Sequence, residues 1–172
     1  MHLDADSIIR LLNLRPLPQE GGYFGETHRA KRVIAESALG SEYSGDRNAS
    51  TAIYFLITSQ EYSALHILPS DEVFHFYLGD PVEMLQLHPD GTANIHFLGT
   101  DLLANMRPQV VVAGNTWQGC RLRPGGQFAL LGCTVAPGFD FRDFRVATSA
   151  VVDELATRFP AHATMIRELA PR

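Results

Sequence analysis

The sequence predicts an all-β domain, a sandwich or a barrel, with short helices at its two ends. From Thr51 onward, short segments rich in β-branched and aromatic residues recur along the chain. Turn signals such as Leu68-Pro-Ser-Asp71 and Arg123-Pro-Gly-Gly126 separate these segments. A spacing of about 8–12 residues is typical of sandwiches and barrels, whereas a parallel α/β sheet would alternate strands with long helices. The length of 172 residues fits one domain.

The elements follow in order along the chain. Apolar residues at helical spacing predict a helix over about 5–13, capped by Asp6 or Ser7. A turn-rich segment then leads into a barrel over about 20–146, and the small, polar residues 35–50 indicate a surface loop. Strands are expected at 51–58, 63–68, 72–78, 82–88, 93–98, 109–113, 117–122 and 127–135. A second helix is predicted over about 149–158, with Ser149 as its cap, and a last turn near 162–169. We interpret residues 1–172 as a single domain.

Composition excludes several classes of function. The net charge of −5 is a poor match for a nucleic-acid-binding protein, which needs a basic face to neutralise phosphates. No run of about 18 apolar residues is present, so we expect no membrane span. The N-terminal residues lack the basic and apolar regions of a signal peptide. Cys120 and Cys133 form no CxxC pair and are interpreted as buried thiols. These features predict a cytoplasmic protein.

The chemistry is concentrated between His66 and Gly79. A hairpin through the Leu68–Asp71 turn would place His66 on one strand and Glu72 at the start of the next. Opposing side chains in such a hairpin lie within about 5 Å. That separation suits a hydrogen-bonded His–carboxylate pair, or two ligands of one metal ion.

These residues resemble the cupin superfamily. His66, Glu72 and Gly79 occupy the first histidine, the glutamate and the final glycine of its first motif. Over roughly 10–148 the chain is similar to the cupin-5 branch, which lacks an established general function. The matching segments are 20–24, 26–27, 50–56, 71–72, 75–77, 79–80, 107–112, 116–118 and 133–141. The resemblance implies a jelly-roll barrel (a double-stranded β-helix) and a homodimer.

The sequence departs from the general cupin pattern at two metal positions. Leu68 stands where the second metal histidine would be, and Trp117 where the third would be. A catalytic metal usually takes three protein ligands. Only His66, Glu72 and His75 remain as candidates. A regular strand sends Glu72 and His75 to opposite faces unless a bulge intervenes. We therefore expect no resident cofactor, with a divalent metal as the alternative.

The resemblance also points to metal-independent sugar-nucleotide epimerases, which bind carbohydrate-like ligands. In that hypothesis His66, oriented by Glu72, is the general base and Tyr54 returns the proton. The substrate-binding candidates are His75, Trp117, Gln118, Tyr23, Glu26 and Thr134. Two alternatives stay open: a non-catalytic ligand-binding or sensing module, and a metal-dependent isomerase or oxygenase. The aromatic segment 137–144 is interpreted as a plug or a dimer surface.

Overall fold

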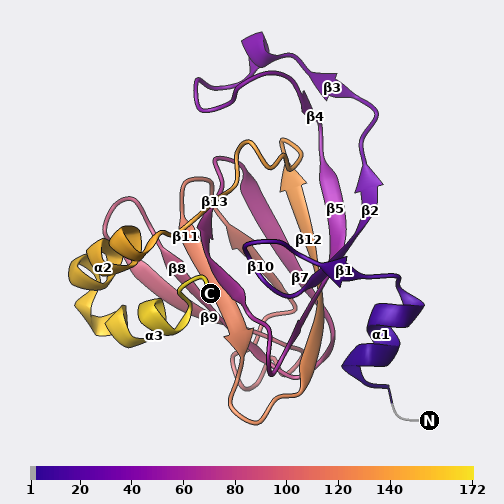
Figure 1. Cartoon of the computed structure of the whole chain (residues 1–172), viewed down its shortest axis with the longest axis vertical. Coiled ribbons are helices and arrows are strands. Elements are labelled where there is room, and N and C mark those ends of the chain that lie inside the picture. Colours follow the sequence, from indigo (N-terminus) through magenta and orange to yellow (C-terminus); the bar gives the residue numbers. More distant parts are fainter. Residues whose placement is uncertain (1–2) are drawn as a thin grey trace.

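The computed structural model describes residues 3–172, which form two antiparallel sheets packed face to face (Figure 1). The six-stranded sheet has the order β1 (Arg15–Pro16), β2 (Tyr23–Arg29), β5 (Thr51–Thr58), β12 (Phe128–Ala136), β7 (Asp71–Gly79) and β10 (Gln109–Val112). The five-stranded sheet has the order β13 (Arg145–Val146), β6 (Ser63–Ile67), β11 (Trp117–Leu122), β8 (Val82–Leu87) and β9 (Ala93–Leu98). This arrangement confirms the predicted jelly-roll barrel.

The main core fills the space between the two sheets. Along β5, Ile53, Phe55 and Ile57 point inward, because alternate residues of a strand face the same side of its sheet. They meet Phe74 of β7 and Met84 of β8, and Phe55, Phe74 and Met84 are at most 1% exposed. Burying one such side chain contributes about 1.5–3 kcal/mol to folding.

Two helices cover the outer face of the five-stranded sheet. These are α2 (Ser149–Arg158) and α3 (Ala163–Glu168), joined by the 3₁₀ turn η2 (Pro160–His162) and drawn in yellow-orange in Figure 1. Leu65 and Leu85 of the sheet pack against Ile166 of α3 in a second apolar cluster. Strand β6 is therefore buried on both faces, which explains why its sequence does not alternate between apolar and polar residues.

The first helix, α1 (Ala5–Leu11), packs its buried Ile8 against Leu56 and Leu130 on the outer face of the six-stranded sheet. Its cap is Asp4, whose carboxylate accepts the Ser7 N–H at 2.8 Å, so the predicted caps Asp6 and Ser7 are wrong. The second helix has the predicted bounds, but its cap is Thr148 rather than Ser149. In both cases the side chain just before the first helical residue is placed to reach the free N–H groups.

The predicted surface loop at 35–50 contains regular structure. Strands β3 (Val33–Ile34) and β4 (Arg47–Asn48) pair in a small separate sheet, and a 3₁₀ turn, η1 (Glu36–Ala38), lies between them. Arg47 is only 2% exposed although most of its neighbours are polar. The polar composition therefore gives no sign that this segment is ordered around the buried charge of Arg47. Among residues 3–172, no helix is long and apolar enough to cross a membrane.

Candidate functional site

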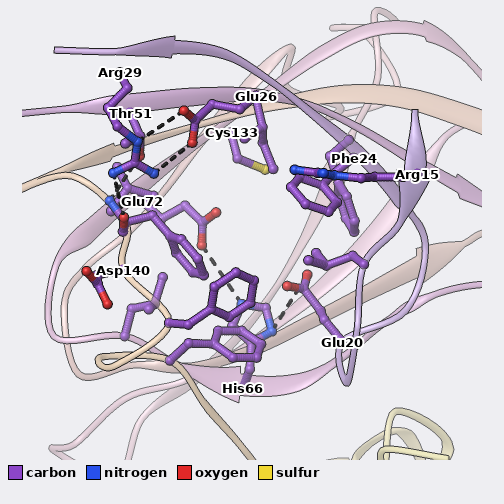
Figure 2. A pocket seen from close by; sticks show the side chains of 18 residues that line it. Arg15, Glu20, Phe24, Glu26, Arg29, Thr51, His66, Glu72, Cys133 and Asp140 are labelled. Atoms are coloured by element: carbon purple, nitrogen blue, oxygen red, sulfur yellow. Dashed lines mark hydrogen bonds and ion pairs between the residues drawn. The ribbon is translucent and has the colours of Figure 1, made fainter. Parts of the chain in front are cut away.

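A cavity of about 440 Å³ lies inside the barrel near the ends of β2, β5 and β12 (Figure 2). Its polar lining comprises Arg15, Glu20, Glu26, Arg29, Thr51, His66, Glu72 and Asp140. The apolar wall includes Phe24, Phe55, Phe139, Phe141 and Phe144. The volume falls within the range of small-molecule pockets.

His66 lies at the buried end of this cavity, between two carboxylates. Its Nδ1–H donates to the Ala64 carbonyl at 2.8 Å and lies 3.9 Å from Glu20 Oε1. On the other side of the ring, Nε2 lies 3.9 Å from Glu72 Oε2. The His66 side chain is 2% exposed, so the ring contributes to the site without free access to solvent.

Glu20 reaches the cavity through a tight turn between β1 and β2. The backbone closes with the Leu17 N–H donating to the Gly22 carbonyl at 2.9 Å. Gly21 has a φ of +95°, and a Cβ atom there would lie 2.5 Å from the Tyr62 carbonyl oxygen, so this position needs glycine. Ser63 Oγ donates to Glu20 Oε1 at 2.7 Å. Glu20 was not among the predicted site residues, although the two glycines after it signal a close backbone approach.

Glu72 is held from the opposite sheet. Gln118 of β11 donates from Nε2 to Glu72 Oε2 at 2.6 Å. Gln118 is also the β-partner of His66 in the β6–β11 pair, so the two side chains share one face of that sheet. Gln118 Oε1 is buried and has no hydrogen-bond partner among the described atoms. The amide therefore orients Glu72 and retains one unused acceptor.

The two carboxylates determine the electrostatics of the site. Burial alone would lower the pKa of His66, but the charges of Glu20 and Glu72 and the Ala64 carbonyl raise it to about 9. Burial raises the pKa of Glu20, and the nearby charge of Glu72 adds to this rise, while His66 opposes it. A pKa in this range favours the imidazolium form of His66 near neutral pH. A protonated imidazole has no free lone pair with which to accept a proton.

The segment 137–144 forms the aromatic side of the cavity mouth. Phe144 packs on His66 with ring centroids 5.2 Å apart, and Phe139 contacts both Phe141 and Phe144. Across the mouth, Arg29 binds Glu26 through two hydrogen bonds of 3.0 and 2.7 Å. These contacts place the aromatic segment and Glu26 at the rim of the cavity, and the choice between a plug and a dimer surface stays a prediction.

Three predicted site residues lie on the outer face of the six-stranded sheet, away from the cavity. Tyr54 alternates with the inward-facing Ile53 and Phe55, and its ring contacts Tyr77 outside the barrel. His75 and Thr134 are bonded to each other at 3.2 Å on the same outer face. The register shift in the β7–β12 pair lies at Leu130–Leu131, beyond His75, so it does not turn His75 inward. Because side chains alternate along a strand, all three residues point away from the cavity, and their predicted place in the site is wrong.

Two further candidates also lie elsewhere. Trp117 points outward from β11 and packs against the cluster under α2 and α3. Tyr23 packs with α1 on the outer face of the six-stranded sheet. Of the substrate-binding candidates, only Gln118 and Glu26 lie at or next to the cavity.

The residues at the cavity do not fit a tight metal centre. Of the His66 nitrogens only Nε2 is left for a metal bond, because Nδ1–H donates to the Ala64 carbonyl, and His75 faces outward. Leu68 lines the wall at a position where the general cupin pattern has a ligand. Among residues 3–172, no group of three or more His, Cys, Asp or Glu side chains is arranged to hold a metal ion.

The two antiparallel sheets, with a histidine and a glutamate facing the cavity between them, define a cupin barrel. Residues 6–147 match the family model Cupin_5, described as "Cupin superfamily (DUF985)". The chain belongs to this family.

The chain is also similar to individual proteins. An uncharacterized protein of Saccharomyces cerevisiae is 29% identical over 133 residues, which are 73% of this chain and 66% of the yeast protein. That match spans slightly less than two thirds of the yeast protein. A solved protein of Shewanella oneidensis is 30% identical with a TM-score of 0.84, covering 99% of this chain and 100% of that protein. A cupin 2 conserved barrel protein of Rhodopseudomonas palustris shares the fold, with 16% identity, a TM-score of 0.57, and coverage of 92% of this chain and 90% of that one.

Proposed function

We propose that the protein is a metal-independent isomerase or epimerase that moves a proton on a small, carbohydrate-like substrate. The observation that supports this proposal is the buried row of Glu20, His66 and Glu72 at the closed end of the cavity. Titratable groups whose environments separate their proton affinities are typical of acid–base sites.

The roles follow from the positions of the three side chains and from the raised pKa values of His66 and Glu20. Glu72 is the base and takes a proton from the carbon next to a substrate carbonyl, and the electron pair of that C–H bond moves to the carbonyl oxygen. The His66 imidazolium keeps a positive charge beside Glu72 and so offsets the charge of the buried carboxylates. Glu20, whose pKa burial raises, is the group that holds a proton for return to the substrate. Tyr54 has no part in this scheme because it faces away from the cavity.

The walls suit a ring-shaped, hydroxyl-bearing ligand. Phe139 and Phe144 offer an apolar face, against which a sugar ring can stack. The unused Gln118 Oε1 beside Glu72 is a buried acceptor for a hydroxyl or water donor. Such a mixture of aromatic walls and a few convergent polar groups is typical of ligand pockets.

The test is solvent deuterium exchange into a panel of reducing sugars, keto sugars and nucleotide-linked keto sugars, measured by mass spectrometry and NMR. We expect the wild type to incorporate deuterium next to the carbonyl of at least one compound. Glu72→Gln should slow this exchange about 100-fold or more, because general-base catalysis typically contributes that much. Glu154→Gln, an exposed change on α2, is the matched control and should behave as wild type.

The proposal fails if no compound of the panel exchanges, or if Glu72→Gln exchanges as fast as the wild type.

One observation favours a second candidate, a non-catalytic binding module: both ring nitrogens of His66 already face protein acceptors. In that case sugars would bind in the cavity with no exchange in any variant.

A further inference from the structure

The mouth of the cavity carries two arginines that differ in their contacts. Arg29 is fully engaged: besides Glu26 it donates to Asn48 Oδ1 at 3.0 Å and to the Phe139 carbonyl at 3.3 Å. Arg15 lines the same cavity, yet within residues 3–172 it makes no hydrogen bond or ion pair with a protein acceptor. One cation of the site is therefore available to a ligand.

The pairing of β1 with β2 directs the Arg15 side chain toward the cavity. Arg15 of β1 and Phe24 of β2 are direct partners in an antiparallel pair, so their side chains lie on the same face. The Arg15 guanidinium lies over the Phe24 ring, 5.0 Å from its centroid, which is within cation–π range. Figure 2 shows the guanidinium across the open space from the Glu26–Arg29 pair. The contact with Phe24 restrains the side chain and leaves its N–H fork without an acceptor.

We infer that Arg15 is an oxyanion-binding residue, and that the substrate is an anionic small molecule carrying a phosphate or carboxylate group. An arginine fork matches either group with two parallel hydrogen bonds. Arg15 lies at the mouth of the cavity. The charged group of the substrate therefore lies at the mouth, and the reacting carbon lies beside Glu72. This inference rests on the proposed function, because it takes the cavity as the substrate site.

The experiment measures anion binding and does not require turnover. In the ¹⁵N-labelled full chain, the Arg15 Nε–H resonance is followed by NMR during titration with inorganic phosphate and, separately, with acetate at constant ionic strength. We expect a saturable shift with at least one of them. Glucose 6-phosphate should then bind more tightly than glucose if phosphate is the anion recognised, and glucuronate should do so if it is carboxylate.

Variants identify the residue responsible. Arg15→Gln should weaken binding of the anion about tenfold or more, as expected for loss of a charged hydrogen bond. Arg15→Lys should recover only part of the affinity, because it keeps the charge but not the fork. Arg123→Gln is the matched control: its guanidinium also lies 5.0 Å from an aromatic centroid, that of Phe97, but outside the cavity. It should bind as wild type.

The inference is overturned if neither phosphate nor acetate gives a saturable shift, or if Arg15→Gln binds the anion as tightly as the wild type does. Glu72→Gln separates this inference from the proposed function, since it should lose deuterium exchange and keep phosphate or acetate binding. Anion binding that depends on Arg15, in a protein that exchanges no deuterium, would support the anion site and reject only the isomerase.

Discussion

His66 combines full burial with a positive charge, and this makes the stability of the protein depend on pH. Its pKa is about 9 in the folded protein, compared with 6.5 for an ordinary imidazole. The stability that its charge contributes is therefore fully present below pH 6.5 and is lost as the pH rises through 9. The raised pKa of Glu20 acts with the same sign. We expect the free energy of unfolding, measured by urea denaturation, to fall by roughly 3 kcal/mol between pH 6.5 and 9.

His66→Gln should remove most of this slope, because no ring remains to titrate, and it should be less stable than wild type at pH 6.5. His28→Gln, a change at an exposed histidine of β2, is the control and should keep the wild-type slope. Equal slopes in the wild type and His66→Gln would show that another group is responsible.

At the level of residues, the sequence located the site only in part. The motif register predicted that His66 and Glu72 approach each other, and the structure brings them to 3.9 Å. The predicted hairpin is wrong, because β6 and β7 lie in different sheets and the two side chains meet across the barrel. Glu20 was not predicted, because it lies 46 residues before His66 and enters through a turn whose path depends on the whole barrel. Tyr54 was placed in the wrong direction because nearly continuous apolar strands give no alternation from which to read the inner face.

At the level of elements, one buried ion pair fixes the loop that carries the aromatic wall. Arg47 donates from Nε to Asp143 Oδ2 at 2.7 Å and from Nη1 to three carbonyls of residues 44–46. Tyr43 and Ser70 add a buried hydroxyl contact of 2.9 Å. The pair thus connects the 35–50 segment to the 137–144 segment, over the mouth of the cavity.

Asp143→Ala should lower the free energy of unfolding by about 3–5 kcal/mol, because it leaves the Arg47 charge buried without its partner. It should also weaken ligand binding, since Phe144 and Phe139 lose their support. Asp153→Ala, on the exposed face of α2, is the matched control, and chemical denaturation measures both. The double change Arg47→Met with Asp143→Leu should recover much of the lost stability. If Asp143→Ala were as stable as wild type, the ion pair would not be the support of this loop.

The elements that the sequence predicts well are those marked by local sequence patterns. Strands β5, β9 and β11 have the predicted bounds, because β-rich runs and sharp turn residues mark both of their ends. The 35–50 segment lies mostly at the surface, as predicted, but its two short regular elements were not predicted, because its order comes from Arg47 and a partner 96 residues away. A contact of that separation leaves no local pattern in the sequence.

At the level of the whole molecule, the two faces of the five-stranded sheet serve different tasks. The inner face carries His66 and Gln118, and the outer face carries Leu65 and Leu85 under the helices α2 and α3. The Leu65 N–H also donates to the Leu169 carbonyl at 2.8 Å, so the C-terminal helices bind the backbone next to His66. The helices α2 and α3 therefore support β6 on its outer face and do not contact the cavity.

This division predicts a variant that loses stability and keeps the site. Ile166 is fully buried on the side of α3 that faces the sheet, so Ile166→Ala should lower the free energy of unfolding by about 2–5 kcal/mol, through lost burial and the cavity that remains. Its neighbour Arg167 is exposed, and Arg167→Ala should lie within about 0.5 kcal/mol of wild type. Both are measured by urea denaturation at pH 6.5. The phosphate or acetate titration of the folded Ile166→Ala protein should match that of the wild type, because the changed side chain lies on the far side of the sheet. A parallel loss of anion binding in the folded variant would instead show that α3 sets the geometry of the cavity through β6.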